Sequence, residues 1–252
     1  MRLELQHLCD TYFKIHPTEG LDKVVPIADA IRKSVKPEMS IHFSFTHYRA
    51  HGAAYELARQ FWGKDPGFTL MATGILEYGI LFIFGGLIKK AIAAFYGDTY
   101  PTSGPNPILQ KAFTEGSVSL ENWTNLTIPL RFMAAAYKLP YISTNSILGS
   151  SMEQNNSHAF HVVEDPVVPG QKVGLLSPLQ PDISIIHGWA ADPSGNTILL
   201  PPYGENLWGA LASKEGVLVT VEQVVSTDFI RRYSHLVKIP AHLVRSVSVV
   251  PF

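Results

Sequence analysis

One short stretch of the sequence gathers many side chains that can hydrogen-bond or carry charge. It runs from Ser40 to Phe61, SIHFSFTHYRAHGAAYELARQF, and its residue types predict a strand that enters a helix through a short turn. Enzymes with open parallel sheets usually place glycines at such a turn, where backbone amides face a ligand. Here the turn contains Phe45, Thr46, His47, Tyr48, Arg49 and His51. The stretch is therefore either an active-site loop with an unusual lining or an ordinary connection.

Two further polar stretches follow predicted strands. Asn145 to Ser151 comes after one strand, and His187 to Asn196 comes after the strand DISII. Open α/β sheets bind ligands at the carboxyl ends of their strands, so these stretches and Ser44 to Arg49 favour one shared crevice. Each also has a purely structural interpretation, since Asp192-Pro193-Ser194-Gly195-Asn196 is by itself a strong turn signal.

Common catalytic and cofactor motifs do not occur in the chain. No GxGxxG follows a strand, and neither HExxH nor GxSxG is present, so dinucleotide, zinc-protease and esterase signatures are missing. His158 and His161 are three residues apart and could share a metal on a helix, but the surrounding sequence has an extended character. We therefore expect no metal site.

Composition excludes several functional classes. A chain of 252 residues, 46% hydrophobic and 16% charged, can form one large α/β domain over residues 1–252. The net charge of −1, without a lysine- or arginine-rich run, argues against binding to nucleic acid or to an anionic membrane. The single cysteine, Cys9, excludes an internal disulfide, and the N-terminus lacks the apolar core of a signal peptide. These features predict a cytoplasmic protein.

The most apolar segment, FTLMATGILEYGILFIFGGLIKK at residues 68–90, raises the alternative of a membrane span. A span needs about 20 predominantly apolar residues, whereas Glu77 and several glycines interrupt this segment. Its first residues, Phe68 to Ala72, have the pattern of a strand. We therefore predict a buried strand followed by a buried helix.

Strand and helix patterns alternate along the chain. The predicted helices are Leu21–Val35, Ala53–Trp62, Ile75–Phe84, Pro107–Glu115, Leu126–Tyr137 with a kink at Pro129, Glu205–Ser213 and Asp228–Leu236. The predicted strands are Met39–Phe45, Phe68–Ala72, Lys89–Phe95, Leu139–Thr144, Val217–Val224 and the closing RSVSVVPF. Strands separated by helices of about ten residues predict an α/β fold with an open, mostly parallel sheet flanked by helices.

Three blocks, taken together, resemble the α subunit of family I CoA-transferases, in the glutaconate CoA-transferase branch. In the first, ENWTNLTIPLRFMAAAYKLPYISTNSILGSSM, a helix with Arg131 and an alanine run leads to Leu-Pro-Tyr and a Leu-Gly-Ser-Ser turn. The second, PDISIIHGWAADPSGNTIL, is similar to the family pattern of a strand, a histidine (His187) and Ala-Asp-x-x-Gly-Asn. The third, VLVTVEQVV, is similar to the family's V-T-V-E strand and contains Glu222. The resemblance extends over residues 20 to 250.

The resemblance implies an open α/β fold that pairs with a homologous β subunit, as a heterodimer or a heterotetramer. It also implies a reaction that moves CoA between carboxylic acids. A glutamate that the β subunit supplies attacks the acyl-CoA thioester, and a second carboxylate collects the CoA, so that one difficult exchange becomes several easier ones. The CoA thioester is then a substrate, and no tightly bound cofactor is expected.

In that family the α subunit has a glycine-rich loop where this chain has HFSFTHYRAHGAAYEL, and the loop amides line the acyl site. Phe43, Ser44 and Phe45 replace those glycines, so side chains project toward the substrate. Arg49 is the residue we expect to bind a substrate carboxylate, because a guanidinium matches a carboxylate bidentately. The substrate-binding candidates are Ser44, Phe45, Thr46, His47, Tyr48, Arg49, Gly149, Ser150 and Ser151.

Two other functions stay open at this point. Relatives on the same scaffold include hydrolases, decarboxylases and C–C lyases that act on an acyl-CoA thioester. A hydrolase would need a local base, for which Glu77, Glu121 and His47 are the candidates. The third possibility is a non-catalytic subunit that completes the pocket and the subunit interface only.

Overall fold

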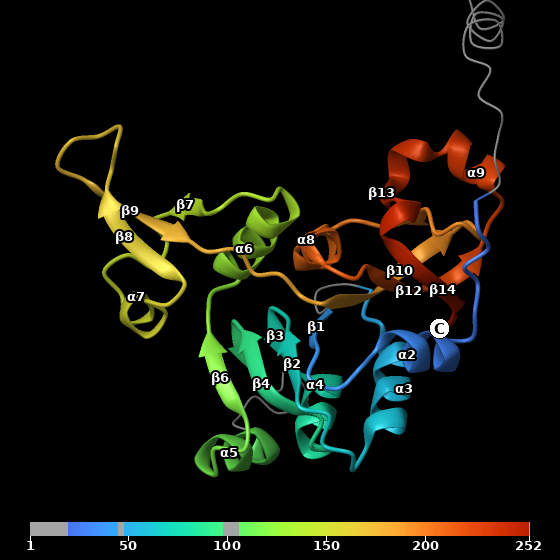
Figure 1. The fold of residues 1–252 in the computed structure, drawn as a ribbon, viewed down its shortest axis with the longest axis horizontal. Coiled ribbons are helices and arrows are strands. Elements are labelled where there is room, and N and C mark those ends of the chain that lie inside the picture. The colour runs from blue at the N-terminus through green and yellow to red at the C-terminus, as the bar shows by residue number, and fades with distance from the viewer. Residues whose placement is uncertain (1–19, 45–47, 98–105, 252) are drawn as a thin grey trace, which may run out of the picture.

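A nine-stranded sheet organises the chain, which we describe from a computed structural model over residues 20–44, 48–97 and 106–251 (Figure 1). The main strands pair in parallel in the order β6-β4-β2-β1-β10-β12-β14. Two short strands complete this sheet: β11 pairs antiparallel with the last two residues of β10, and β13 pairs antiparallel with β11. The strands of this sheet are β1 (Ser40–Phe43), β2 (Phe68–Met71), β4 (Ile88–Ala93), β6 (Ser119–Asn122), β10 (Ile183–Ala191), β11 (Thr197–Ile198), β12 (Val217–Val224), β13 (Val237–Ile239) and β14 (Val244–Val249). The predicted α/β fold with a mostly parallel sheet is confirmed.

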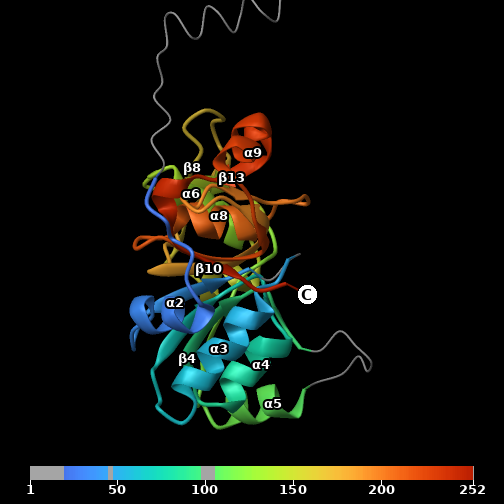
Figure 2. The same ribbon diagram turned by 90° about the vertical axis from the view of Figure 1, so that its right-hand side faces the viewer.

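Helices cover both faces of the sheet, as Figure 2 shows. One layer consists of α2 (Ile27–Ser34), α3 (His51–Phe61), α4 (Glu77–Phe84) and α5 (Pro107–Thr114). The other contains α6 (Thr127–Ala136) and α8 (Glu205–Ala212). Because side chains alternate along a strand, Ile41 and Phe43 of β1 pack toward α3 and α4, while His42 packs against Phe132 of α6. Other short elements are β3 (Gly74–Ile75), β5 (Phe95–Tyr96), α9 (Thr227–Arg232) and the 3₁₀ turns η1 (Ser234–Leu236) and η2 (Ala241–Leu243).

A separate three-stranded antiparallel sheet extends from one side of the main sheet (Figure 1). Its core is continuous with that of α6, since Phe160 and Leu176 belong to the same buried cluster as Phe132. The strand predicted at Leu139–Thr144 is present, but its pairing in a second sheet was not predicted. Its elements are β7 (Ile142–Thr144), α7 (Ser151–Asn155), β8 (Phe160–Glu164) and β9 (Lys172–Leu176).

Several predicted boundaries differ from the structure. The first described helix begins at Ile27 instead of Leu21. Residues 23–25 are extended and hydrogen-bond to Val247 of β14, and Pro26 directly precedes the helix. Pro129 lies in the first turn of α6, where an amide proton has no partner within the helix, so it requires no kink. Strand β6 was not predicted at all.

The apolar segment at residues 68–90 forms β2, β3 and α4 and then enters β4. The helix α4 has 8 residues, most of them buried against the sheet. Across the described part of the chain, no helix combines the length and the apolar character that a bilayer crossing requires. The prediction of a buried strand followed by a buried helix is confirmed.

Close packing between α8 and β1 predicts a strong effect of Gly209→Ala. His42 is fully buried, its Nδ1 lies 2.6 Å from Ser184 Oγ, and burial lowers its pKa to about 3, so the ring is neutral. A Cβ at position 209 would overlap this imidazole. We expect a loss of about 1–3 kcal/mol in the free energy of unfolding, measured by urea denaturation. Gly79→Ala is the milder comparison, since its Cβ would meet Ile75 Cγ2 at 3.0 Å. Equal stability of Gly209→Ala and wild type would contradict this packing.

Candidate active site

The strand order reverses between β1 and β10, the place where open α/β sheets are expected to have a ligand crevice. From β1 the chain adds β2, β4 and β6 in one direction, and from β10 it adds β12 and β14 in the other. Ligands of open α/β sheets bind outside the carboxyl ends of strands at such a reversal. Phe43 is level with Ile185, and the Ser44 amide donates to the Ile185 carbonyl at 3.2 Å, so Ser44 lies level with Ile186, one residue before His187.

An accessible ion cluster lies near this crevice. Arg49 Nη1 donates to Glu77 Oε1 at 2.8 Å, and His51 Nε2 lies 3.6 Å from Glu77 Oε2. The side chains of Arg49, His51 and Glu77 are 28%, 30% and 50% exposed, so solvent and ligands can reach all three. Glu77 is the first residue of α4 and has a φ of 32°, in the region that L-residues rarely adopt. We name these three residues the rim cluster.

Behind the rim cluster, a buried histidine joins β10 to β12. His187 Nε2 lies 2.8 Å from Glu222 Oε1, and Nδ1 lies 2.8 Å from Thr220 Oγ1. Because the carboxylate can only accept, Nε2 carries the proton of the neutral ring, and the one proton of the Thr220 hydroxyl can go to Nδ1 at 2.8 Å or to the Ile186 carbonyl at 3.3 Å. Burial lowers the pKa of His187 against the opposing effect of Glu222, and the charge of His51 lowers it further.

Tyr78 fixes the end of β1 below the crevice. Its hydroxyl donates to the Ser44 carbonyl at 2.6 Å, and its ring meets the His51 ring edge-on with centroids 5.6 Å apart. Burial raises the pKa of Tyr78, and the charge of Glu205 at the start of α8 raises it further. The phenol is therefore neutral and serves as a donor that ties α4 to β1.

The structure brings some of the predicted site residues together and separates others. Ser44 is buried, Tyr48 has a φ of 58° and is half-buried, and Arg49 belongs to the rim cluster. Phe45, Thr46 and His47 lie outside the described residues. Gly149, Ser150 and Ser151 are exposed at the start of α7, which Figure 1 places well away from β1 and α3. Their role in substrate binding stays a prediction.

The three predicted polar stretches do not meet at one crevice. Asn145 to Ser151 connects β7 to α7, and α7 leads to Asn156, which donates to the carbonyl of Asn122 at the end of β6 and not at the end of β1. His187 does not follow its strand, because β10 continues to Ala191 through its pairing with β12. Only the end of β1 and the middle of β10 come together as expected.

The turn at residues 192–196 is held by its own side chains. Asp192 accepts from the backbone amide and the side-chain amide of Asn196 at 2.8 and 2.9 Å, and Asn196 Oδ1 accepts from the Ala241 amide at 3.1 Å. Asp192 is fully buried. These contacts give the turn a structural role, which is the interpretation that the turn signal predicts.

Asp192→Ala is accordingly expected to lower stability more than chemistry. Two amides lose a buried acceptor, which costs about 1–3 kcal/mol, and the activity per folded molecule stays unchanged. Asp228→Ala is a matched control, because that side chain is 76% exposed and pairs only at the surface with Arg231. Thermal unfolding and active-site titration measure the two quantities. A selective loss of turnover in a stable Asp192→Ala variant would contradict the structural role.

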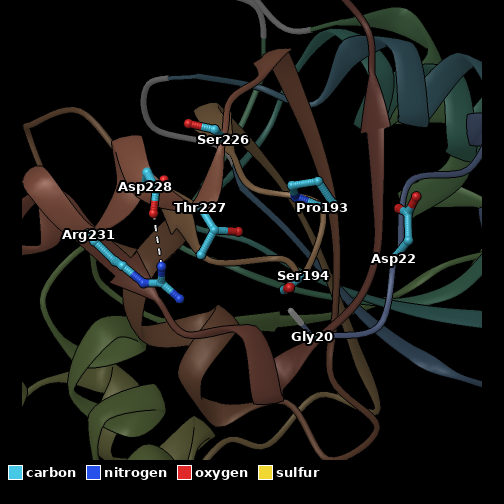
Figure 3. A pocket seen from close by; sticks show the side chains of 8 residues that line it. All are labelled: Gly20, Asp22, Pro193, Ser194, Ser226, Thr227, Asp228 and Arg231. Atoms are coloured by element: carbon cyan, nitrogen blue, oxygen red, sulfur yellow. Dashed lines mark hydrogen bonds and ion pairs between the residues drawn. The ribbon is translucent and has the colours of Figure 1, made fainter. Parts of the chain in front are cut away.

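A cavity of about 490 Å³ lies beyond the ends of β10 and β12 (Figure 3). Figure 3 shows Ser194 near Gly20, and Arg231 paired with Asp228. Neither the rim cluster nor His187 belongs to the lining of this cavity. It is not part of the candidate active site. Its lining residues are Gly20, Asp22, Pro193, Ser194, Ser226, Thr227, Asp228 and Arg231.

Glu121 is unsuited to act as a base. It accepts from Lys90 Nζ at 2.6 Å, Trp123 Nε1 at 2.7 Å and Arg131 Nη1 at 3.1 Å, and His158 Nε2 lies 3.3 Å away. Burial acts to raise the pKa of Glu121, but these hydrogen bonds and charges outweigh it and lower the pKa to about 2. A carboxylate held so firmly ionised does not take up a proton near neutral pH. Within the described ranges, no three His, Cys, Asp or Glu side chains are grouped to hold a metal.

Comparison with known proteins identifies the family. Residues 24–249 match the coenzyme A transferase family model. The chain belongs to this family. Among its relatives, the A subunit of glutaconate CoA-transferase from Acidaminococcus fermentans is 25% identical over 92% of this chain and 76% of that protein. The crystal structure of glutaconate coenzyme A-transferase from the same organism superposes with a TM-score of 0.79 at 24% identity, over 91% of this chain and 76% of that chain.

A further relative bears on chain length. An uncharacterised protein of Archaeoglobus fulgidus is 30% identical over 93% of this chain. This chain spans about half the length of that relative, namely 51%.

Proposed function

We propose that this chain is the α subunit of a heteromeric CoA-transferase, and that a homologous β subunit supplies the nucleophilic glutamate. The observation that carries the proposal is the rim cluster, which holds an accessible arginine near the β1–β10 crevice of a coenzyme A transferase family fold. The similarity to the A subunit of glutaconate CoA-transferase supports the assignment to the α type. The oligomer contains both kinds of subunit.

In this mechanism the partner's glutamate attacks the carbonyl carbon of the acyl-CoA thioester and expels CoA thiolate. The product is an acyl-glutamyl anhydride, and CoA thiolate then attacks the glutamyl carbonyl, which releases the first acid and leaves a glutamyl-CoA thioester. The second acid attacks this thioester through its carboxylate, and the same steps in reverse deliver CoA to it. Arg49 of this chain binds a carboxylate of the acid substrate through charge-assisted hydrogen bonds.

The proposal is tested by following CoA from an acyl-CoA in the reconstituted complex. A transferase forms a new acyl-CoA only when an acceptor acid is present, and it releases little free thiol. A hydrolase releases free CoA at the same rate with and without the acid, because water is its acceptor. Free CoA as the main product, independent of any acid, would overturn the assignment.

A further inference from the structure

We propose that Glu77 is a positioning residue that gathers Arg49 and His51 into a carboxylate-binding pair. This inference rests on the proposed function, because it concerns the same substrate acid. It assigns a role to two residues, Glu77 and His51, whose contribution to substrate binding the sequence did not predict.

The backbone at Glu77 is left-handed, as it also is at Glu38, Tyr48, Asp65 and Lys138. Its φ of 32° lies in the left-handed region, which glycine adopts more readily than an L-residue does. Strained residues of this kind occur where the surrounding structure fixes them for binding or catalysis. Glycine would satisfy this backbone at the first position of α4, so a glycine variant separates the effect of the backbone from that of the carboxylate.

The side chain of Glu77 joins residues from two parts of the turn after β1. Its Oε1 accepts from Arg49, which precedes α3, and its Oε2 lies 3.6 Å from His51, the first residue of α3. The His51 ring is also confined, stacked on Tyr55 at 6.4 Å and edge-on to Tyr78 at 5.6 Å. One carboxylate thus hydrogen-bonds a guanidinium and lies 3.6 Å from an imidazole on the same turn.

Holding two nitrogen donors in place lowers the cost of binding an anion. Long side chains such as arginine lose conformational entropy when a ligand fixes them, and a donor that is already fixed avoids that loss. Removal of the Glu77 carboxylate would leave Arg49 and His51 without their shared anion. The binding of a substrate carboxylate would then have to order both side chains by itself.

The test compares Glu77→Gln with Glu38→Gln in the complex with the partner subunit. Glu38 is a matched control, because it also has a positive φ, of 67°, and also pairs with a cation, Lys89, in an exposed position. We expect Glu77→Gln to raise the KM for the acceptor acid about tenfold while the KM for acyl-CoA stays unchanged. Glu38→Gln leaves both constants unchanged, and Glu77→Asp restores part of the acceptor affinity.

Glycine and alanine variants separate positioning from a merely structural role. Glu77→Gly removes the carboxylate and the backbone strain, whereas Glu77→Ala removes only the carboxylate. Glu77→Gly is expected to melt about 2–4 °C above Glu77→Ala, yet both should show the raised acceptor KM. A Glu77→Gly variant with wild-type acceptor KM would overturn the inference. A lowered acceptor KM in Glu77→Gln would also overturn it, since Glu77 would then compete with the substrate.

Calorimetric titration with succinate keeps the inference testable if no pair of acids supports transfer. The proposed function would fail in that case, but the carboxylate site would remain measurable in the same complex. Wild type should bind succinate about tenfold more tightly than Glu77→Gln, with Glu38→Gln equal to wild type. Equal binding by wild type and Glu77→Gln, or no binding by wild type, would overturn the inference.

Discussion

Arg49→Ala is expected to lower kcat/KM for the acceptor acid by about 10- to 100-fold, because charge-assisted hydrogen bonds of about 1.5–3 kcal/mol are lost. Arg49→Lys should recover only part of this loss, since an ammonium keeps the charge but cannot form the bidentate fork. Initial rates with the acceptor and the acyl-CoA varied separately measure the effect. The acyl-CoA dependence should change less than the acceptor dependence.

Arg59→Ala serves as the control for this prediction. Arg59 lies in the last turn of α3, is 68% exposed and pairs with Glu56 at the surface. Its removal takes away the same charge from the same region without touching the rim cluster, so turnover should not change. An Arg49→Ala variant with wild-type acceptor kinetics would remove Arg49 from the substrate site.

Glu121→Ala is expected to have the largest effect on stability, about 3–5 kcal/mol. The reason is that Arg131 is buried and, together with Lys90, would lose its anionic partner. Urea denaturation of the variant and of wild type measures the difference. Glu215→Ala is the control, because Glu215 and Arg245 are about half exposed at 3.7 Å and such surface pairs contribute only about 0–1 kcal/mol.

The same carboxylate gives a defined pH dependence. Because the folded pKa of Glu121 is lowered from 4.5 to about 2, its stabilisation is fully present above pH 4.5 and is lost as pH falls toward 2. A shift of this size corresponds to about 3 kcal/mol. The stability difference between wild type and Glu121→Gln should therefore shrink over this range. A difference that stays constant from pH 5 to pH 3 would contradict the ionised, paired state of Glu121.

The sequence predicts the main sheet well where local pattern decides the structure. The strand predicted at Val217–Val224 agrees with β12, and the helix predicted at Ala53–Trp62 agrees with α3 to within two residues. The antiparallel sheet was not predicted, since Ile142 of β7 pairs with Leu176 of β9, 34 residues later. Local periodicity carries no information about such a partner.

The site shows the same division between local and long-range information. Arg49 was singled out because its side-chain chemistry suits a carboxylate and its position follows a strand. Glu77 was considered only as a base, and its ion pair with Arg49 spans 28 residues of sequence. The contact between His187 and Glu222 spans 35 residues and arises from the pairing of β10 with β12. These contacts follow from strand order, which the sequence pattern left open.

The most direct test of the proposed function measures CoA transfer by this chain alone, by the isolated partner and by the two together. We expect no turnover by either chain alone and full transfer from acyl-CoA to an acid by the mixture. Replacement of the partner's nucleophilic glutamate by alanine should abolish this transfer. Turnover of an acyl-CoA by this chain alone, or transfer that survives the replacement in the partner, would contradict the proposed function.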